Sequence, residues 1–387
     1  MSRTLLANLT PDVFLRRHWQ KRPLLARQAL PAARTLLTPE VLFRLAVRDD
    51  VQARLVTHFG RRWEVSHGPF TRRILSRLPP HDWTLLVQGV NHVLPQAGAL
   101  LHEFSFIPYA RLDDLMVSYA PPGGGVGPHF DSYDVFLLQL AGTRLWRVST
   151  QRDLALVERA PLRLLRNFRP ASEWRLAPGD MLYLPPQCAH EGIAVDHCLT
   201  ASIGFRADTT QELGTRFLEF LADHLALDGC YTDPRLRATS HPARIGDDLL
   251  RKSCRSLARI RWSRRTVLEF LGCYLTEPKP HVTFEAAARP VRLSAFARSV
   301  ASRGARLDLK TLMLYYGELV FINGSVCAPA PRTAALLRRL ADQRCLAPPA
   351  HLDAESARCL YQWYRAGYIG IGAEHSLCGG SRDRQSP

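Results

Sequence analysis

Short apolar segments separated by turn residues fill the stretch from residue 135 to residue 184, and they constrain the fold more than any other feature of the chain. Val135 to Leu140 is a nearly continuous apolar run, residues 141–143 read as a turn, and residues 144–148 alternate between polar and apolar. This pattern predicts a β-hairpin. Met181 to Leu184, bounded by Gly179-Asp180 and two prolines, predicts another strand. The segment is therefore expected to form antiparallel sheet.

His129, Asp131 and His190 are the side chains of a candidate metal site. In a strand, His129 and Asp131 point to the same face because side chains alternate. His190 follows the Met181 to Leu184 run and would bring a third ligand from a distant strand. Two histidines and one carboxylate hold mononuclear Fe(II) and leave positions open for a cosubstrate and dioxygen. The alternative is coincidence, since the chain has 14 histidines and most histidines lie at the surface or in a satisfied core.

Arg144 shares its predicted strand face with Trp146, so an inward Trp146 would carry Arg144 inward beside it. An enclosed guanidinium needs an anion, and its planar fork binds a carboxylate through two hydrogen bonds. The cosubstrate favoured is therefore 2-oxoglutarate, with O2 as the oxidant and succinate and CO2 as products. The alternative is a surface arginine next to an amphipathic tryptophan.

The sequence around these residues resembles the bacterial ribosomal oxygenases of the RoxA or YcfD type, which are JmjC-domain cupin oxygenases. The matching segments are 14–24, 82–92, 113–119, 122–136, 146–148, 179–192 and 202–207. The resemblance implies a double-stranded β-helix, or jelly-roll, core. It also implies Fe(II)- and 2-oxoglutarate-dependent hydroxylation of an arginine side chain on a large-subunit ribosomal protein, the one numbered sixteen.

The resemblance also implies roles for single residues. The implied roles are iron ligand for His129, Asp131 and His190, binding of the 2-oxoglutarate C5 carboxylate for Arg144, and a place in the cosubstrate or substrate pocket for Ser118. Cys188 and Ala189 stand where an aromatic residue and a proline are expected, and Ser132 stands where a longer polar residue is usual. These departures leave the iron ligands in place and concern the pocket lining, and therefore the target residue.

An arginine substrate needs carboxylates at the pocket mouth, and the acidic residues nearest the motif are Asp113, Asp114, Asp134 and Glu191. For Asp134 the favoured interpretation is a group that orients a ligand histidine.

Two other functions stay open: a JmjC hydroxylase or demethylase acting on histidine or lysine, and a catalytically silent cupin that binds the ribosome or nucleic acid. A phosphate loop at 123–127 is rejected, because the glycines lack the following Lys and Ser/Thr.

The chain is strongly basic, with a formal net charge of +16 and a pI near 9.9. The densest cluster consists of Arg251, Lys252, Arg255, Arg259, Arg261, Arg264 and Arg265. It predicts a helix with Arg251, Arg255 and Arg259 on one face, which either contacts ribosomal RNA or is simply solvated. The 9 cysteines form no C-x-x-C pair, which fits reduced thiols. With no long apolar span and no apparent secretory signal, we expect a cytoplasmic protein without membrane contact.

The predicted fold class is α+β, with five consecutive parts. They are an N-terminal helical and strand extension of the core (1–93), the JmjC/cupin core (94–207), a helical dimerisation region (208–277), a winged-helix-like domain (278–375) and a disordered tail (376–387). Within them, Thr209 to Glu212 is expected to open a helix that Gly229 ends, residues 312–324 predict a hairpin, and 331–343 and 354–366 predict helices. An apolar stripe wider than one packed face needs favours a homodimer.

Overall fold

The computed structural model describes residues 5–60 and 62–373; the predicted tail 376–387 lies outside them. Most of the first half forms two facing antiparallel sheets. The large sheet has the spatial order β1 (Leu24–Ala26), β9 (Met181–Leu184), β6 (Val135–Ala141), β11 (Cys198–Phe205), β5 (Leu112–Ala120), β4 (Trp83–Val87), β2 (Ala53–Phe59) and β3 (Arg62–His67). The small sheet has the order β10 (Ala189–Ala194), β7 (Arg144–Ser149) and β8 (Ser172–Leu176). The jelly-roll prediction is confirmed.

The predicted hairpin turn at 141–143 joins β6 to β7, but these two strands do not pair with each other. Instead β6 pairs with β11 and β9, while β7 pairs with β10 and β8. The chain therefore crosses at Gly142 from one sheet to the other, so the simple hairpin expected from the sequence is wrong. A jelly roll allows this because consecutive strands can belong to opposite sheets of the sandwich.

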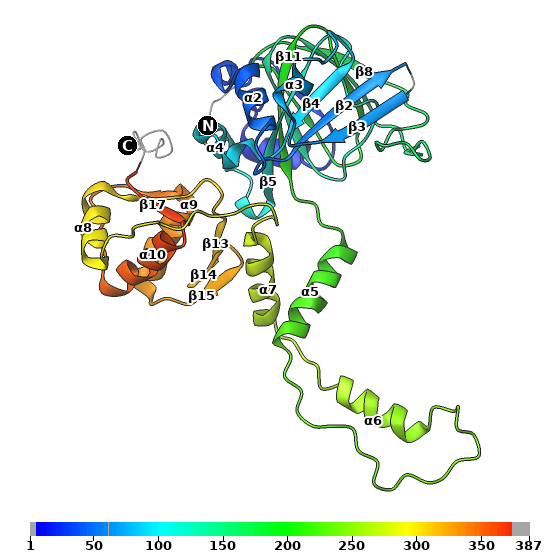
Figure 1. Ribbon diagram of the computed structural model, residues 1–387, viewed down its shortest axis with the longest axis vertical. Helices are drawn as coiled ribbons and strands as arrows, with labels where there is room; N and C mark the ends of the chain where they lie inside the picture. Colours follow the sequence, from blue (N-terminus) through cyan, green and yellow to red (C-terminus); the bar gives the residue numbers. More distant parts are fainter. Residues whose placement is uncertain (1–4, 61, 374–387) are drawn as a thin grey trace.

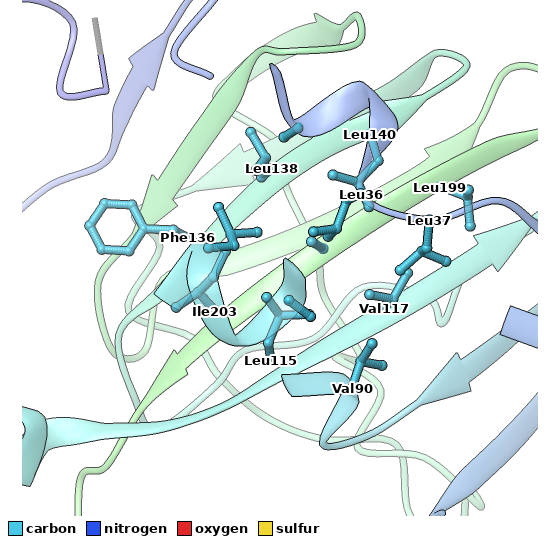
Figure 2. Close-up of a cluster of buried hydrophobic side chains, with 14 of the residues drawn as sticks. Leu36, Leu37, Val90, Leu115, Val117, Phe136, Leu138, Leu140, Leu199 and Ile203 are labelled. Carbon is cyan, nitrogen blue, oxygen red and sulfur yellow. The ribbon is translucent and has the colours of Figure 1, made fainter. Parts of the chain in front are cut away.

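The two faces of the large sheet have different neighbours because strand side chains alternate. Leu115, Val117, Phe136, Leu138 and Ile203 belong to the main core on the outer face. Figure 2 shows this cluster, in which the strand side chains meet Leu36, Leu37 and Val90 from the N-terminal part. The intervening positions, including Met116, Ser118, Leu137, Thr200 and Ser202, line a cavity between the sheets. The N-terminal extension thus covers one face and leaves the other for a site.

Short helices lie before β5, and two of them begin at a threonine side-chain cap, Thr10 and Thr71. The helices are α1 (Pro11–Arg17), η1 (Pro31–Thr35), α2 (Pro39–Ala46), α3 (Arg72–Leu75), η2 (Val90–His92), α4 (Pro95–His102) and η3 (Tyr109–Arg111). Thr10 caps α1, with Pro11 in the first turn, as the sequence predicts. Phe14 of α1 is fully buried against Phe136 and Tyr183. Most of these helices contribute apolar side chains to the main core, among them Phe14, Ala33, Leu42, Val90 and Leu100.

The C-terminal part has its own core around Phe296, Leu337, Leu340 and Leu360. Its elements are α7 (Arg264–Thr276), α8 (Leu293–Arg303), β12 (Ala305–Leu307), β13 (Met313–Tyr316), β14 (Leu319–Ile322), β15 (Ser325–Cys327), α9 (Pro331–Gln343), β16 (Cys345–Leu346), α10 (Ala354–Arg365) and β17 (Ile369–Ile371). The hairpin β13–β14 and the helices α9 and α10 agree with the sequence prediction. In Figure 1 this part, coloured yellow to red, lies beside the lower end of the jelly roll.

Between the two parts, α5 (Thr210–His224) and α6 (Asp247–Leu257) form an arm. α5 packs against α7 through the rings of Phe217 and Phe220, which contact Phe270, while α6 extends away from both parts (Figure 1). The capping box of Thr209 and Glu212 starts α5, as predicted. The single basic helix predicted from 251 onward is wrong, since α6 ends at Leu257. Arg259 lies in the following turn, and Arg261 lies in the irregular chain before α7. Among the described helices, none has the length and hydropathy needed to cross a bilayer.

Candidate functional site

His129 and His190 lie directly opposite each other in an isolated antiparallel bridge. The His129 amide donates to the His190 carbonyl at 2.9 Å, and the His190 amide donates to the His129 carbonyl at 2.8 Å. His190 is the second residue of β10, whereas His129 has only this one bridge and Asp131 lies in irregular chain. The prediction that His129 and Asp131 share a regular strand is therefore wrong. Backbone pairing with β10 supplies the alignment that a strand would have given.

His129, Asp131 and His190 offer ligand atoms that all lie within 4.8 Å of one another. The Nε2 atom of His190 is 3.8 Å from Asp131 Oδ2. The Nδ1 atoms of His129 and His190 are each 2.9 Å from a backbone carbonyl, that of Gly127 and Cys188 respectively. Because a carbonyl only accepts, each Nδ1 carries the proton and each Nε2 lone pair is free for a metal ion. Burial, together with nearby His129, lowers the pKa of His190 to about 4, so the imidazole is neutral at pH 7.

Asp131 also has a neighbour that the sequence reasoning did not single out. Burial, followed by the charge of the nearby Asp131 carboxylate, raises the pKa of Tyr133. Tyr133 lines the cavity and is partly exposed. It is therefore a cavity residue beside the carboxylate that stays protonated at neutral pH.

A cavity of about 450 Å³ surrounds the trio. Its walls come from both sheets and from the loop that carries Arg163. Arg163 also covers the ring of Phe130, with its guanidinium carbon 5.1 Å from the ring centroid. The enclosed volume is of the size that small-molecule sites have in general.

Arg144 lies at the inner end of this cavity and is 3% exposed. Its guanidinium donates to Ser118 Oγ at 3.2 Å, to Thr200 Oγ1 at 3.4 Å and to the Gly192 carbonyl at 3.2 Å. Within the described residues, Arg144 Nε has no hydrogen-bond partner and no carboxylate pairs with the guanidinium. Burial lowers the pKa of Arg144. A buried, uncompensated guanidinium facing a cavity fits the carboxylate of a dicarboxylic acid such as 2-oxoglutarate.

The inward orientation of Arg144 beside Trp146 is therefore confirmed, with the guanidinium carbon 5.2 Å from the Trp146 ring centroid. Gly192 makes this packing possible. A Cβ atom at Gly192 would lie 2.7 Å from the Trp146 ring and 2.9 Å from Arg144 Nε. The sequence reasoning included Gly192 in a motif and gave it no role, because the contact crosses from β10 to β7.

Of the four acidic candidates, Asp113 and Asp114 line the cavity, at the end away from Arg144. Asp134 is buried and accepts hydrogen bonds from Tyr183 at 2.5 Å and Gln20 at 3.0 Å. The interpretation that Asp134 orients a ligand histidine is therefore wrong. Glu191 faces Arg147 at 3.5 Å on the outside of the small sheet.

Asp114, Met116 and Ser118 alternate along β5 on the face that lines the cavity. Four residues of strand separate Asp114 from Ser118 by roughly 13 Å. An acidic end and a basic end are thus held apart by one strand, with the histidine and aspartate trio between the sheets. Gln88, which donates to both Asp114 oxygens at 3.0 and 2.9 Å, was also missed by the sequence reasoning.

Comparisons with known proteins agree with this architecture. Residues 99–213 match the JmjC domain, and residues 259–370 match the ROXA-like winged helix. The chain is 40% identical over 238 residues to the ribosomal protein uL16 3-hydroxylase of Escherichia coli and 40% identical over 234 residues to a probable ribosomal oxygenase of Haemophilus influenzae. These alignments cover 61% and 59% of the chain but only 62% and 55% of the two relatives.

Solved structures match over a larger share of both chains. The X-ray structure of E. coli YcfD superposes with a TM-score of 0.81 at 30% identity, covering 94% of this chain and 98% of that one. The structure of YcfD in complex with cobalt and 2-oxoglutarate has a TM-score of 0.79 at 30% identity, covering 94% and 99%. The fold and the site define a JmjC-domain oxygenase of the cupin type with a winged helix. More particularly, the chain belongs to the ribosomal oxygenase family.

Proposed function

We propose that this protein is an Fe(II)- and 2-oxoglutarate-dependent oxygenase that hydroxylates an arginine side chain of the large-subunit ribosomal protein uL16. The observation that carries the proposal is the order of groups in one cavity: a buried unpaired arginine, a trio suited to a metal, and a pair of carboxylates. The uL16 hydroxylase from E. coli supports the substrate class.

Each site residue has a role in this proposal. His129 and His190 bind the iron through Nε2 and Asp131 through a carboxylate oxygen, while Arg144 and Ser118 hold the far carboxylate of 2-oxoglutarate. Iron with 2-oxoglutarate and O2 supplies an oxidant strong enough for an unactivated C–H bond, with release of succinate and CO2. The protein positions the two small molecules and the substrate carbon, and its enclosed cavity limits access of water.

The acidic end of the cavity favours arginine over histidine as the substrate side chain. Asp113 and Asp114 are carboxylates, and a guanidinium binds carboxylates through several directed hydrogen bonds. The long apolar stem of arginine would lie along Met116, which separates Asp114 from Ser118 on the cavity face of β5. A lysine would reach the same carboxylates as a point charge, so a lysine product is the main competing outcome.

The test is mass spectrometry of uL16 after incubation with the purified protein, Fe(II), ascorbate and 2-oxoglutarate. The expected result is a mass increase of one oxygen atom that fragmentation assigns to an arginine, with matching succinate release. His129→Ala is the control and should give neither. Oxygen on a histidine, or loss of a methyl group from lysine, would replace the proposed target with one of the alternatives, and no turnover with any ribosomal protein would favour a binding role.

The arm supports a proposal about assembly. The side chains of Leu218, Ile245, Leu250 and Leu257 are 65%, 73%, 58% and 64% exposed, respectively. We propose that the helical region 208–277 forms a homodimer by covering these side chains. Its basic residues, such as Arg251 and Arg255, would remain on the outside, where they are placed to contact ribosomal RNA.

The proposed domain limits are 1–93, 94–207, 208–277 and 278–375, followed by the tail 376–387. Because the proposed substrate is a ribosomal protein, we also propose that the protein works in the cytoplasm.

Sedimentation analysis of the full chain, with Leu250→Lys as the variant, tests the dimer. A monomer at every concentration would exclude it.

A further inference from the structure

Lys279 reaches the acidic end of the active-site cavity from outside the jelly roll. Its Nζ atom lies 3.0 Å from Asp113 Oδ1 and 3.3 Å from Asp114 Oδ2. Lys279 comes from the segment that follows α7, about 165 residues away in sequence from the two aspartates. It is not among the residues that line the cavity. The ammonium therefore contacts the carboxylates from outside the cavity lining, whereas Gln88, which lines the cavity, donates to both Asp114 oxygens.

The carboxylate of Asp114 depends on few partners. Asp114 is 4% exposed, and within the described residues its carboxylate accepts side-chain hydrogen bonds from Gln88 and Lys279. Asp113 has a second cation, Arg206, whose Nε atom is 3.9 Å from Oδ1. Burial of the ammonium lowers the pKa of Lys279, but the negative charges of Asp114 and Asp113 outweigh this effect, so the pKa is raised overall. Lys279 is thus the cation that compensates the more deeply buried carboxylate.

The segment that carries Lys279 is held on both sides. Pro278 and Pro280 flank the lysine and restrict its backbone. The Nδ1 atom of His281 lies 3.1 Å from the side-chain amide nitrogen, Nε2, of Gln52, which precedes β2. On the other side, Lys310 donates to the Thr283 carbonyl at 2.6 Å. The linker therefore connects the winged-helix part directly to the strands that form the cavity mouth.

We propose that Lys279 is a positioning residue through which the winged-helix part sets the affinity of the cavity mouth for a cationic substrate side chain. The inference rests on the proposed function, in that the substrate is taken to present an arginine. Lys279 holds Asp114 in one orientation and compensates its charge in the absence of substrate. The substrate guanidinium then binds the side of the carboxylate pair that faces the cavity.

The physical reason is the cost of leaving a buried charge without a partner. Removal of one member of a buried ion pair leaves the other charge uncompensated, and the remaining group relaxes by rotating toward water or by taking up a proton. Either change would remove the acceptor that the substrate needs. If Lys279 instead competed with the substrate for the carboxylates, its removal would strengthen substrate binding, so the two interpretations predict opposite signs.

The experiment measures binding of a uL16 peptide with one arginine to the full-length protein by calorimetry, under argon with Fe(II) and 2-oxoglutarate. For Lys279→Met we expect Kd, and KM in aerobic turnover, to rise about tenfold. The kcat at saturating peptide and the KM for 2-oxoglutarate should stay near the wild-type values. Lys279→Arg, which keeps the charge, should recover at least part of the affinity. Lys21→Ala, which removes a positive charge on the N-terminal extension, is the matched control.

The outcomes separate this inference from the proposed function. An unchanged or lower Kd for the peptide in Lys279→Met, with the melting temperature of the wild type, would overturn the inference. So would wild-type protein that binds the arginine peptide no better than a peptide with glutamine in place of the arginine. If the peptide binds through its arginine but another residue is oxidised, the proposed target is wrong while the role of Lys279 is still decided by Kd. If Lys279→Met lowers kcat and the melting temperature together with the peptide affinity, the role of Lys279 is purely structural.

Discussion

His129 and His190 exchange two backbone hydrogen bonds, of 2.9 and 2.8 Å, and their ring centroids lie 4.2 Å apart. Main-chain pairing therefore sets the relative position of the two Cα atoms, from which both imidazoles project toward the same site. The carbonyls of Gly127 and Cys188 fix the ring orientation as well. A metal ion would find two of its ligands already in place, so little ordering free energy is needed on binding.

Asp131→Ala should remove metal binding without unfolding the protein. Asp131 is the one carboxylate of the trio, and its side chain is 23% exposed, so its loss opens no cavity in the core. We expect metal affinity to fall at least about 100-fold and substrate hydroxylation to disappear. Calorimetric titration with Co(II) measures the affinity. Glu158→Gln, at an exposed site outside the cavity, should bind Co(II) like the wild type; tight binding by the Asp131 variant would contradict the proposed ligand set.

Arg144→Met should separate cosubstrate binding from stability. Without the guanidinium, KM for 2-oxoglutarate should rise about 100-fold, and the increase in melting temperature on adding 2-oxoglutarate should vanish. The free energy of unfolding without ligand should be equal or higher, because a buried charge without a carboxylate partner has been removed. Arg147→Met is the control on the same strand, since Arg147 pairs with Glu173 outside the cavity. A normal KM in the Arg144 variant would exclude the proposed contact.

Gly192→Ala should disturb both packing and cosubstrate binding. The added methyl group would lie 2.7 Å from Trp146 and 2.9 Å from Arg144 Nε, so one of the two side chains must move. We expect the free energy of unfolding to fall by about 1–3 kcal/mol, with weaker binding of 2-oxoglutarate. Denaturant titration measures the first effect. Gly214→Ala in α5, where a Cβ meets nothing within 4 Å, should instead raise stability by about 1 kcal/mol.

The thiol of Cys359 should be alkylated at lower pH than the buried thiol of Cys188. A hydrogen bond from Cys327 lowers the pKa of Cys359 below the usual value of a thiol, whereas burial raises the pKa of Cys188 to about 11. The thiolate is the reactive form and exists above the pKa, so labelling of Cys359 with iodoacetamide should reach half its maximal rate at a lower pH than labelling of Cys188, which stays unlabelled at neutral pH. Peptide mass mapping across pH measures both. Cys327→Ser weakens the hydrogen bond and should move the Cys359 profile to higher pH; an unchanged profile would refute its cause.

Local patterns in the sequence predicted the parts of the structure that local forces decide. Helix α9 has the predicted limits because Pro331 starts it and its apolar residues recur at helical spacing. Arg144 was expected to face inward because it shares a strand face with Trp146, and it does. The basic helix was predicted too long, since a charge pattern does not reveal that the chain turns after Leu257.

The acidic end of the cavity could not be predicted in the same way. Asp114 was only one of four acidic candidates, and no sequence spacing distinguishes it from Asp134, which is buried against Tyr183 instead. Lys279 and Gln88 reach Asp114 from segments that no motif connects with it. The crossing of the chain at Gly142 was missed for a related reason: the turn residues were recognised, but the choice of partner strand depends on the whole sandwich.

Strand β5 carries Asp114, Met116 and Ser118 on its cavity face. The distance between the two ends of the cavity is therefore built into the backbone, at about 3.4 Å per residue, and no rotamer change can alter it. An inserted residue would not lengthen it smoothly, because every later side chain would turn to the opposite face. For the proposed arginine substrate, this fixed spacing would make side-chain length, as well as charge, a condition for binding.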